Sequence, residues 1–474
     1  MRRPAAAAPI LLFCCLLAGA SAVAEGVELP AYERVVLDNG TVLILNRHAE
    51  VPLIGLRAIL KGGAVADPAG MNGMASLFAA LIGKGAGDRN AQAFAEAVGA
   101  VGGVLTARAG LEAIEVEADF LARDAGLLVE LLADMLMRPA LDEAEFDKLR
   151  ERSINLIRAA KDTDLNGLMP AYGAAFLFGE HPYGNPVDGS EETLGNISHE
   201  ALLAYYEAQI GGDRLIVSVS GDFELDGMRE RLTAAFSGWR QTLEPLPEVD
   251  AIGPESGRRV LLIDKPGATQ TYFWITNVGV AVDYPSRAEL DIANTVYGGR
   301  FTSMLNTALR IESGLTYGAR SRLLRPSRRG SVAISSFTRT DATVEAIDMA
   351  LGVLTRLHDE GIDATMIESA QNYLLGQFPT RLETAAQLAG QLAMLEAYGL
   401  DDAHVNAYGE AIAAADRASV EAVIAEVYPL PDNLVFVLLG DAAAIRDSIT
   451  KYGPVTEVAI TEPRFRITTK PEPD

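Results

Sequence analysis

Apolar and polar positions along the chain follow two different spacings, which predict an alternation of strands and helices. Residues 34–37 and 42–45 have the composition of short strands, and they flank Asp38-Asn39-Gly40, a sequence typical of tight β-hairpins. Residues 121–137 and 143–161 have the wider apolar spacing of amphipathic helices. Because strands recur between helices, we expect a sheet with helices packed on it.

This pattern occurs twice in the chain. Residues 213–222 form an apolar strand that ends in Gly-Asp, and 219 positions later residues 432–441 do the same. The earlier strand at 53–60 corresponds in the same order to 271–276, and each of these two strands leads to an aspartate and then a helical pattern. The repetition predicts an α+β protein of two duplicated sandwich domains, each a mainly antiparallel sheet with helices packed on it.

The two repeats are separated by residues 244–257, which are rich in proline and lack periodicity, as in an interdomain linker. We therefore predict an N-terminal domain at 25–243 and a C-terminal domain at 258–474.

Residues 1–24 have the organisation of a secretory signal peptide. Arg2-Arg3 precede an apolar run at 10–17, and small residues follow up to Ala22-Val23-Ala24. This order predicts cleavage after Ala24 and export to the periplasm. An uncleaved membrane anchor is the alternative, but the strictly apolar core is short for a membrane span.

Amino-acid composition limits the kinds of site and partner that the chain can have. Both cysteines, Cys14 and Cys15, lie in the predicted signal peptide, so the mature chain would have neither a disulfide nor a thiolate metal site. The formal net charge of −24 disfavours nucleic acid and anionic lipid as partners. No later stretch is long and apolar enough to predict a membrane span.

Short motifs in a consistent order carry a resemblance to a known family. They are Asn39-Gly40-Thr41, Lys61-Gly62-Gly63-Ala64, Gly73-Met74-Ala75, His181-Pro182-Tyr183-Gly184, Tyr297-Gly298-Gly299, Gly314-Leu315-Thr316-Tyr317 and Gln377-Phe378-Pro379. With them, nearly all of the mature chain resembles the insulinase-like (pitrilysin) metallopeptidases, which include mitochondrial processing peptidase. The resemblance implies that the two domains form a clamshell.

The zinc motif of that family is missing. Active members carry H-x-x-E-H on the helix after the Gly-Met-Ala turn, where two histidines bind zinc and the glutamate acts as general base. Here Ser76, Ala79 and Ala80 occupy the three positions, and none of them binds zinc tightly or abstracts a proton. The family's third ligand, a glutamate, would fall in 153–157, which has no carboxylate, although Glu151 lies one turn away. The resemblance therefore implies a degenerate metal site.

Histidines elsewhere give no strong alternative. None of His48, His181, His199, His358 and His404 forms an i, i+4 pair, so a helical two-histidine site is excluded. A site assembled from distant histidines stays open. We expect no cofactor in this chain, and a structural role for His181 in its loop.

Two residues of the second half stand at positions that bind the substrate in the family. The resemblance implies that Arg310 and Tyr317 bind the substrate carbonyl, since a guanidinium and a phenol can donate hydrogen bonds to a developing oxyanion. The pattern predicts a helix at 303–310, a turn at Gly314 and a strand that begins at Tyr317, so that both side chains point into one cavity. On residue type alone, a surface arginine and a half-buried strand tyrosine would be the simpler interpretation.

Small bacterial members of the family often work as pairs in which one chain has H-x-x-E-H and the other has the arginine and tyrosine. The resemblance therefore implies a non-catalytic subunit of a heterodimeric zinc peptidase, and the predicted signal peptide places it in the periplasm. The partner, a homologous chain with H-x-x-E-H, would hold the zinc, while this chain would bind the peptide substrate. The alternative is a peptide-binding or scaffold protein with no role in any active site. The sequence leaves homodimerisation open, and it does not decide whether residues 297–300 line the chamber or serve packing.

Overall fold

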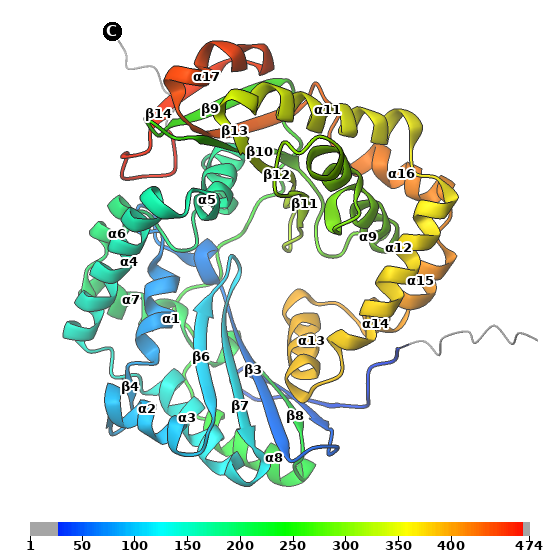
Figure 1. Cartoon of the computed structure of the whole chain (residues 1–474). Helices are drawn as coiled ribbons and strands as arrows, with labels where there is room; N and C mark the ends of the chain where they lie inside the picture. The colour runs from blue at the N-terminus through cyan, green and yellow to red at the C-terminus, as the bar shows by residue number, and fades with distance from the viewer. Residues whose placement is uncertain (1–26, 468–474) are drawn as a thin grey trace, which may run out of the picture.

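The computed structural model describes residues 27–467, so the predicted signal peptide lies outside the described part of the chain. Two six-stranded sheets form its framework (Figure 1). The first has the order β1 (Glu33–Val36), β2 (Val42–Arg47), β8 (Leu215–Gly221), β3 (Leu53–Lys61), β7 (Ala113–Leu121), β6 (Val104–Ala109). The second has the order β11 (Ala319–Leu324), β12 (Ser331–Arg339), β10 (Gln270–Val278), β13 (Leu434–Gly440), β9 (Arg258–Asp264), β14 (Val455–Ala459).

The two sheets have the same topology over five strands. Read from β6, the first sheet runs β6-β7-β3-β8-β2, and read from β11, the second runs β11-β12-β10-β13-β9. In each sheet one pair of these strands is parallel, β2 with β8 and β9 with β13, and the other pairs are antiparallel. The predicted duplication and the α+β class are therefore confirmed, and so is the hairpin of β1 and β2.

Helices of each half pack mainly on its own sheet. Those of the first half are α1 (Met74–Ile82), α2 (Ala91–Ala100), α3 (Ala125–Met137), α4 (Glu143–Thr163), α5 (Leu165–Phe178), α6 (Glu191–Asn196), α7 (His199–Gln209) and α8 (Leu225–Phe236). Those of the second are α9 (Arg287–Asn294), α10 (Met304–Asn306), α11 (Thr343–Glu360), α12 (Ala364–Gln377), α13 (Ala385–Tyr398), α14 (Ala403–Asn406), α15 (Tyr408–Ala414), α16 (Arg417–Val427) and α17 (Ala442–Ile449).

The predicted helix at 121–137 begins later than expected. Strand β7 continues to Leu121, because its side chains alternate between buried and partly buried positions, and α3 starts only at Ala125. The helix predicted at 143–161 is confirmed as α4.

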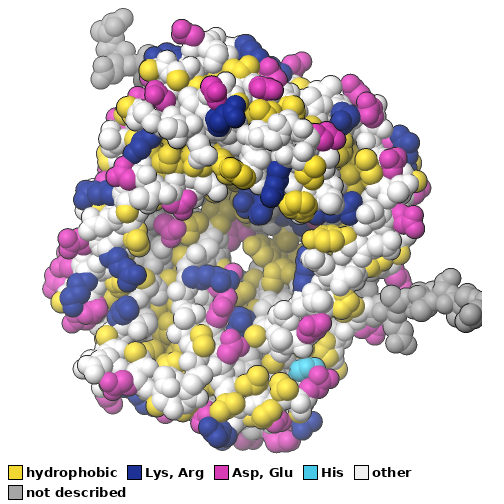
Figure 2. All heavy atoms as spheres, viewed as in Figure 1, with side chains coloured by type: hydrophobic (Ala, Val, Ile, Leu, Met, Phe, Trp, Pro, Cys, Tyr) yellow, Lys and Arg dark blue, Asp and Glu magenta, His cyan; other side chains and the backbone are white. Residues whose placement is uncertain are grey.

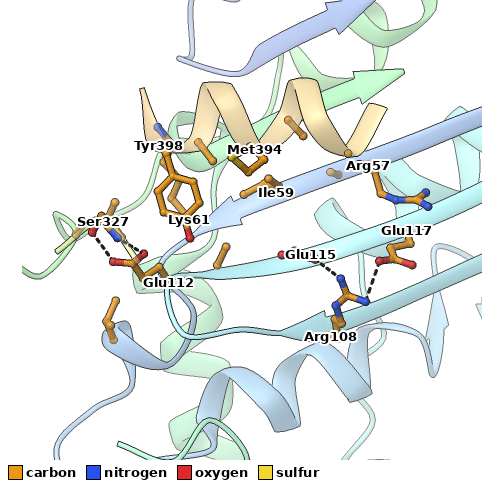
Figure 3. A pocket seen from close by; sticks show the side chains of 18 of the residues that line it. Arg57, Ile59, Lys61, Arg108, Glu112, Glu115, Glu117, Ser327, Met394 and Tyr398 are labelled. Atoms are coloured by element: carbon orange, nitrogen blue, oxygen red, sulfur yellow. Dashed lines mark hydrogen bonds and ion pairs between the residues drawn. The ribbon is translucent and has the colours of Figure 1, made fainter. Parts of the chain in front are cut away.

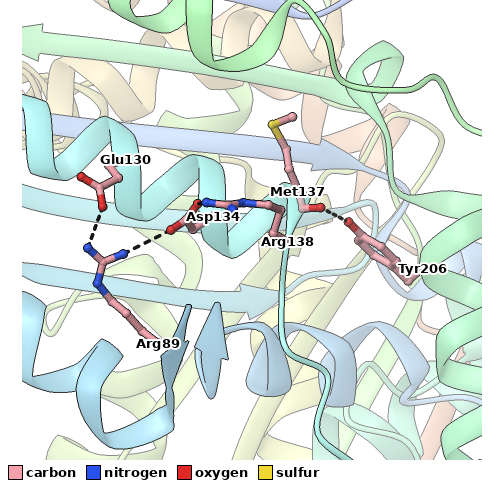
Figure 4. A network of polar contacts seen from close by, with 6 residues as sticks. All are labelled: Arg89, Glu130, Asp134, Met137, Arg138 and Tyr206. Atoms are coloured by element: carbon pink, nitrogen blue, oxygen red, sulfur yellow. Dashed lines mark hydrogen bonds and ion pairs between the residues drawn. The ribbon is translucent and has the colours of Figure 1, made fainter. Parts of the chain in front are cut away.

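A small hairpin docks on α3 through a buried carboxylate. Strands β4 (Gly85–Ala86) and β5 (Arg89–Asn90) form the hairpin, and Arg89 contacts Asp134 of α3 at 3.2 Å (Figure 4). Arg138 also donates to Asp134, whose side chain is 6% exposed. Two guanidinium groups thus compensate a charge that would be costly to bury alone.

Two helices are exchanged between the halves. Helix α5, from the first half, packs on β10 and β13 of the second sheet, while α13, from the second half, packs on β3 and β8 of the first sheet. Each sheet is thus covered on one face by its own helices and on the other by a helix of the opposite half (Figure 1). This double cover explains why every residue of β8 and β13 is buried.

Glycines allow the exchanged helices to approach closely. A Cβ atom on Gly55 of β3 would lie 2.4 Å from the backbone nitrogen of Ala386 in α13. A Cβ atom on Gly173 of α5 would lie 2.7 Å from the Trp274 ring of β10. A side chain at position 55 would push α13 away from the first sheet, and one at position 173 would displace the Trp274 ring or α5.

The N-terminal segment contacts helices of the second half, and the segment between the halves contacts the first. The Leu29 backbone N–H donates to Asn406 of α14 at 2.8 Å, and Arg34 forms a two-bond ion pair with Glu396 of α13. Residues 244–257 form no helix or strand, and the Asp250 carbonyl lies 3.0 Å from His181 Nε2. His181 thus has a structural role, as expected.

Glu112 forms a polar bridge between the halves. Its carboxylate accepts hydrogen bonds from the Tyr183 hydroxyl at 2.6 Å and from the Ser327 backbone N–H at 2.8 Å. Tyr183 belongs to the first half, whereas Ser327 lies in the β11–β12 turn of the second. The charge makes these bonds stronger than neutral ones.

We expect Glu112→Gln to lower the free energy of unfolding by about 1–3 kcal/mol, because it replaces charge-assisted bonds by neutral ones. It should also speed amide hydrogen exchange around Ser327. Glu115→Gln is the matched control: Glu115 pairs with Arg108 within the first half, and this exposed pair should contribute less than about 1 kcal/mol. Equal effects of the two substitutions would contradict a bridging role.

Candidate functional site

The helix that carries the degenerate zinc motif is held at its N-terminus by Asp67. The two carboxylate oxygens accept hydrogen bonds from the Gly73 N–H at 2.7 Å and the Ala75 N–H at 2.8 Å. These donors belong to the start of α1, where free N–H groups favour a carboxylate. Burial nevertheless raises the pKa of Asp67 to about 7, against the lowering effect of these hydrogen bonds.

This pKa predicts a pH-dependent stability. Between pH 4 and 7 the carboxyl is ionised in the unfolded chain but keeps its proton in the folded one, so the folded state is favoured at low pH and loses that advantage as pH rises. We expect the stability of the wild type relative to Asp67→Asn to decrease as pH is raised from about 4 to about 7. Urea denaturation of both proteins across this range measures the effect, and parallel pH profiles would contradict it.

The motif positions lie on α1 as the sequence predicts. Ser76 and Ala80 are one helical turn apart and reach the surface, whereas Ala79 is 3% exposed and packs in the core. The Ser76 hydroxyl donates to Asp188 at 2.9 Å. Its Oγ is therefore bound to a carboxylate from the loop before α6, a partner that the sequence did not indicate.

A cavity of about 720 Å³ lies where the family's metal site would be. Ser76 lines it together with Ser153, Leu156 and Ile157 of α4, which is the segment where the third ligand was expected. Most of the remaining lining is apolar and comes from both halves, including Leu324 and Phe465, which the sequence did not single out.

The side chains present do not fit a zinc ion. Of the two carboxylates that line the cavity, Asp188 accepts from Ser76 and Asp164 caps α5 by accepting from the Gly167 N–H. Within residues 27–467 no cluster of three histidine, cysteine or acidic side chains is arranged to hold a metal. Zinc prefers such donors, and an apolar wall supplies none.

The segment with Arg310 and Tyr317 differs in detail from the prediction. After the short helix α10, residues 307–312 form a π-helical segment that includes Arg310. Strand β11 begins at Ala319, so Tyr317 lies in the preceding loop and does not open the strand. It is 80% exposed and not half-buried, because it lies before Ala319, the residue at which the pairing of β11 with β12 begins.

Backbone hydrogen bonds hold the loop before Tyr317 against the turn that carries Arg310. The N–H groups of Leu315 and Thr316 both donate to the Leu309 carbonyl, at 3.0 and 3.2 Å. Arg310 is exposed, and its guanidinium carbon lies 4.8 Å from the centre of the Phe301 ring. Neither Arg310 nor Tyr317 lines the cavity at Ser76. Short π-helical segments are common at functional sites.

The segment 297–300 serves packing at Tyr297. This side chain is 0% exposed, and its ring meets Tyr428 edge-on with 5.3 Å between the ring centres. A Cβ atom on Gly298 would lie 2.2 Å from the Ser321 backbone nitrogen. The motif therefore positions β11 against the core.

A second cavity, of about 310 Å³, lies between the first sheet and α13 (Figure 3). Ile59 and Lys61 of β3 line one side, and Met394 and Tyr398 of α13 the other. The space-filling view shows a wide hollow between the two halves (Figure 2).

Comparisons with known proteins identify the family. Residues 43–188 match the family described as Insulinase (Peptidase family M16), and residues 196–374 match the Peptidase M16 inactive domain. The chain belongs to the peptidase M16 (insulinase) family and lacks its H-x-x-E-H motif.

Relatives include both named proteases and a named non-protease. The uncharacterized zinc protease YmxG of Bacillus subtilis is 22% identical, over 74% of this chain and 85% of that protein. The non-peptidase homolog YmxG of Helicobacter pylori is 21% identical, over 72% and 78%.

Solved structures share the fold. A peptidase M16 inactive domain from Pseudomonas fluorescens superposes with a TM-score of 0.80 at 19% identity, covering 87% of this chain and 98% of that one. The periplasmic protease PqqL from Escherichia coli superposes with a TM-score of 0.73 at 14% identity, covering 87% of this chain and 46% of that one.

Among residues 27–467 no helix is long and apolar enough to cross a membrane.

Proposed function

We propose that this protein is the non-catalytic subunit of a heterodimeric periplasmic zinc peptidase. The partner, a homologous chain with H-x-x-E-H, supplies the zinc and the general base. This chain supplies Arg310 and Tyr317, which bind the substrate carbonyl, and holds no zinc of its own.

One observation supports the proposal: the first half lacks metal-binding residues at the motif positions, while the second half exposes Arg310 and Tyr317, the two residues assigned to substrate binding. Ser76, Ala79 and Ala80 lie on the regular helix α1, and the cavity that Ser76 lines is mostly apolar. Arg310 and Tyr317 have solvent-exposed side chains, the first on a π-helical turn and the second on the loop that follows it. The Arg310 guanidinium lies over the exposed Phe301 ring, and the Tyr317 ring centre lies 6.5 Å from that of the partly buried Phe337, so neither side chain packs on a fully buried aromatic ring.

The first sheet offers a place for an extended peptide. Strand β6 pairs with β7 alone within the described residues, so its other edge has unpaired N–H and C=O groups. Helix α1, with the motif positions, packs against β6. A peptide that adds to this edge as a strand would pass the degenerate site uncut.

The periplasmic location rests on the N-terminal sequence and on the similarity to a periplasmic protease. Fractionation of cells that produce the full chain tests it, together with N-terminal sequencing of the mature protein. Cleavage after Ala24 is the expected result, and an intact N-terminus in the cytoplasm would overturn this part of the proposal.

Peptide cleavage tests the function itself. A mixed quenched-fluorescent peptide library is incubated with this protein alone, with its H-x-x-E-H homologue alone, and with the co-purified pair. We expect cleavage by the pair alone. Chelator-sensitive cleavage by this chain alone would contradict the loss of the metal site, and no cleavage in any sample would favour a scaffold.

A further inference from the structure

A cavity in the second half gathers cationic side chains. It measures about 380 Å³, and Arg287 and Asp291 of α9, Arg325 after β11, Arg381 and His404 line it. Three arginines thus face one carboxylate. This excess of positive charge is local, since the chain as a whole has a formal net charge of −24.

The single carboxylate is already engaged. Asp291 Oδ1 lies 2.9 Å from Arg325 Nη2, and Oδ2 accepts a hydrogen bond from the Tyr408 hydroxyl at 2.8 Å. Among residues 27–467, no other acidic side chain lines the cavity. Asp291 can therefore balance one arginine and has no oxygen left without a partner.

The remaining guanidinium donors of the three arginines have no anionic partner among the described residues that line the cavity. Arg287 lies with its guanidinium carbon 4.4 Å from the centre of the Tyr408 ring and donates to the ring nitrogen and the carbonyl of His404, which are neutral acceptors. Arg325 Nη1 is buried without a hydrogen-bond acceptor among the described residues. Arg381 is exposed and lines the cavity as well.

The lowered pKa of His404 is consistent with a positively charged cavity. Burial, together with repulsion of the imidazolium by Arg287 and Arg325, lowers the pKa of His404 to about 4. His404 is therefore neutral at physiological pH and accepts from Arg287. Burial also lowers the pKa of Arg287, opposed mainly by Asp291.

We propose that this cavity binds a compact oxyanion, a carboxylate or phosphate group, between Arg287, Arg325 and Arg381. Guanidinium groups donate in a planar fork that matches both groups, and an unpaired buried donor gains most from such a ligand. The site belongs to this chain alone and does not depend on the proposed function.

The cavity adjoins the cleft between α13 and the first sheet, so a peptide in that cleft is one source of the anion. Met394 and Tyr398 of α13 line both this cavity and the cleft between α13 and the first sheet. A peptide in that cleft could place a terminal carboxylate among the arginines. Inorganic phosphate is the other source of the same chemistry.

Titration calorimetry on the whole protein tests the site with three ligands at matched ionic strength: inorganic phosphate, a trialanine peptide with a free carboxylate, and its C-terminal amide. We expect the wild type to bind phosphate or the free-acid peptide, and not the amide. Binding of the free acid identifies a peptide end as the source, whereas binding of phosphate alone identifies a free anion.

Three variants make the test specific. Arg325→Met and Arg381→Met should weaken binding about tenfold or more, the usual effect of losing a charge-assisted bond. Arg381 is exposed, so its variant should fold even if loss of the Arg325–Asp291 pair unfolds the other. Arg356→Met, on the surface of α11, should bind like the wild type. No anion binding by the wild type, or undiminished binding by Arg381→Met, would overturn the proposal.

Discussion

Replacing Arg310 with alanine or Tyr317 with phenylalanine is expected to lower turnover by the proposed heterodimer about 100-fold, while the zinc content of the complex stays unchanged. The reason is that each side chain would donate a hydrogen bond to the oxyanion that develops on the substrate carbonyl, and one such donor is typically worth a factor of 10²–10³. The metal, held by the partner, would not sense the change. Steady-state kinetics and metal analysis of the purified complex measure both quantities.

Matched controls separate this role from general damage. Arg356→Ala and Tyr373→Phe change the same residue types at exposed positions of α11 and α12, and neither should alter turnover. Since Arg310 and Tyr317 are themselves exposed, their variants should melt like the wild type. Unaltered turnover in both Arg310→Ala and Tyr317→Phe would refute the assigned role.

Replacing Gly55 with alanine is expected to lower the free energy of unfolding by roughly 1–3 kcal/mol, the usual range for overpacking a tight interface. The new methyl group would meet the Ala386 backbone, at 2.4 Å from its nitrogen and 2.5 Å from its Cα atom. A helix backbone cannot rotate away as a side chain can, so α13 as a whole would have to move off the first sheet. Urea denaturation measures the loss, and small-angle X-ray scattering detects any opening of the halves.

Gly390→Ala gives the opposite expectation on the same helix. A Cβ atom there meets nothing closer than the Arg57 Cγ atom at 3.7 Å, and alanine favours a helix interior over glycine by roughly 0.5–1 kcal/mol. We expect this variant to be slightly more stable than the wild type. A stable Gly55→Ala protein with α13 in place would mean that the contact is looser than the structure indicates.

Much of the fold was predictable from the sequence because its signals are local or repeated. The strands at 213–222 and 432–441 share their apolar run and Gly-Asp end, and they form the equivalent strands β8 and β13. The loss of the zinc ligands at Ser76, Ala79 and Ala80 is also visible from residue type, since no fold can make an alanine bind metal.

Local spacing was less reliable where the backbone departs from regular geometry. The helix expected at 303–310 widens into a π-helical segment, and Tyr317 precedes its strand. A π-helix differs from an α-helix by one residue per hydrogen-bonded turn, and the apolar pattern of a short segment does not resolve that difference.

The sequence by itself determined the duplicated α+β architecture, the family and the absence of the zinc motif, because these depend on residue types in a fixed order. Tertiary structure alone decided that α5 and α13 are exchanged between the sheets, that Glu112 joins the halves, and that Arg287, Arg325 and Arg381 meet in one cavity. These features depend on contacts between residues far apart in the chain, and no local periodicity records which distant partner a surface will meet.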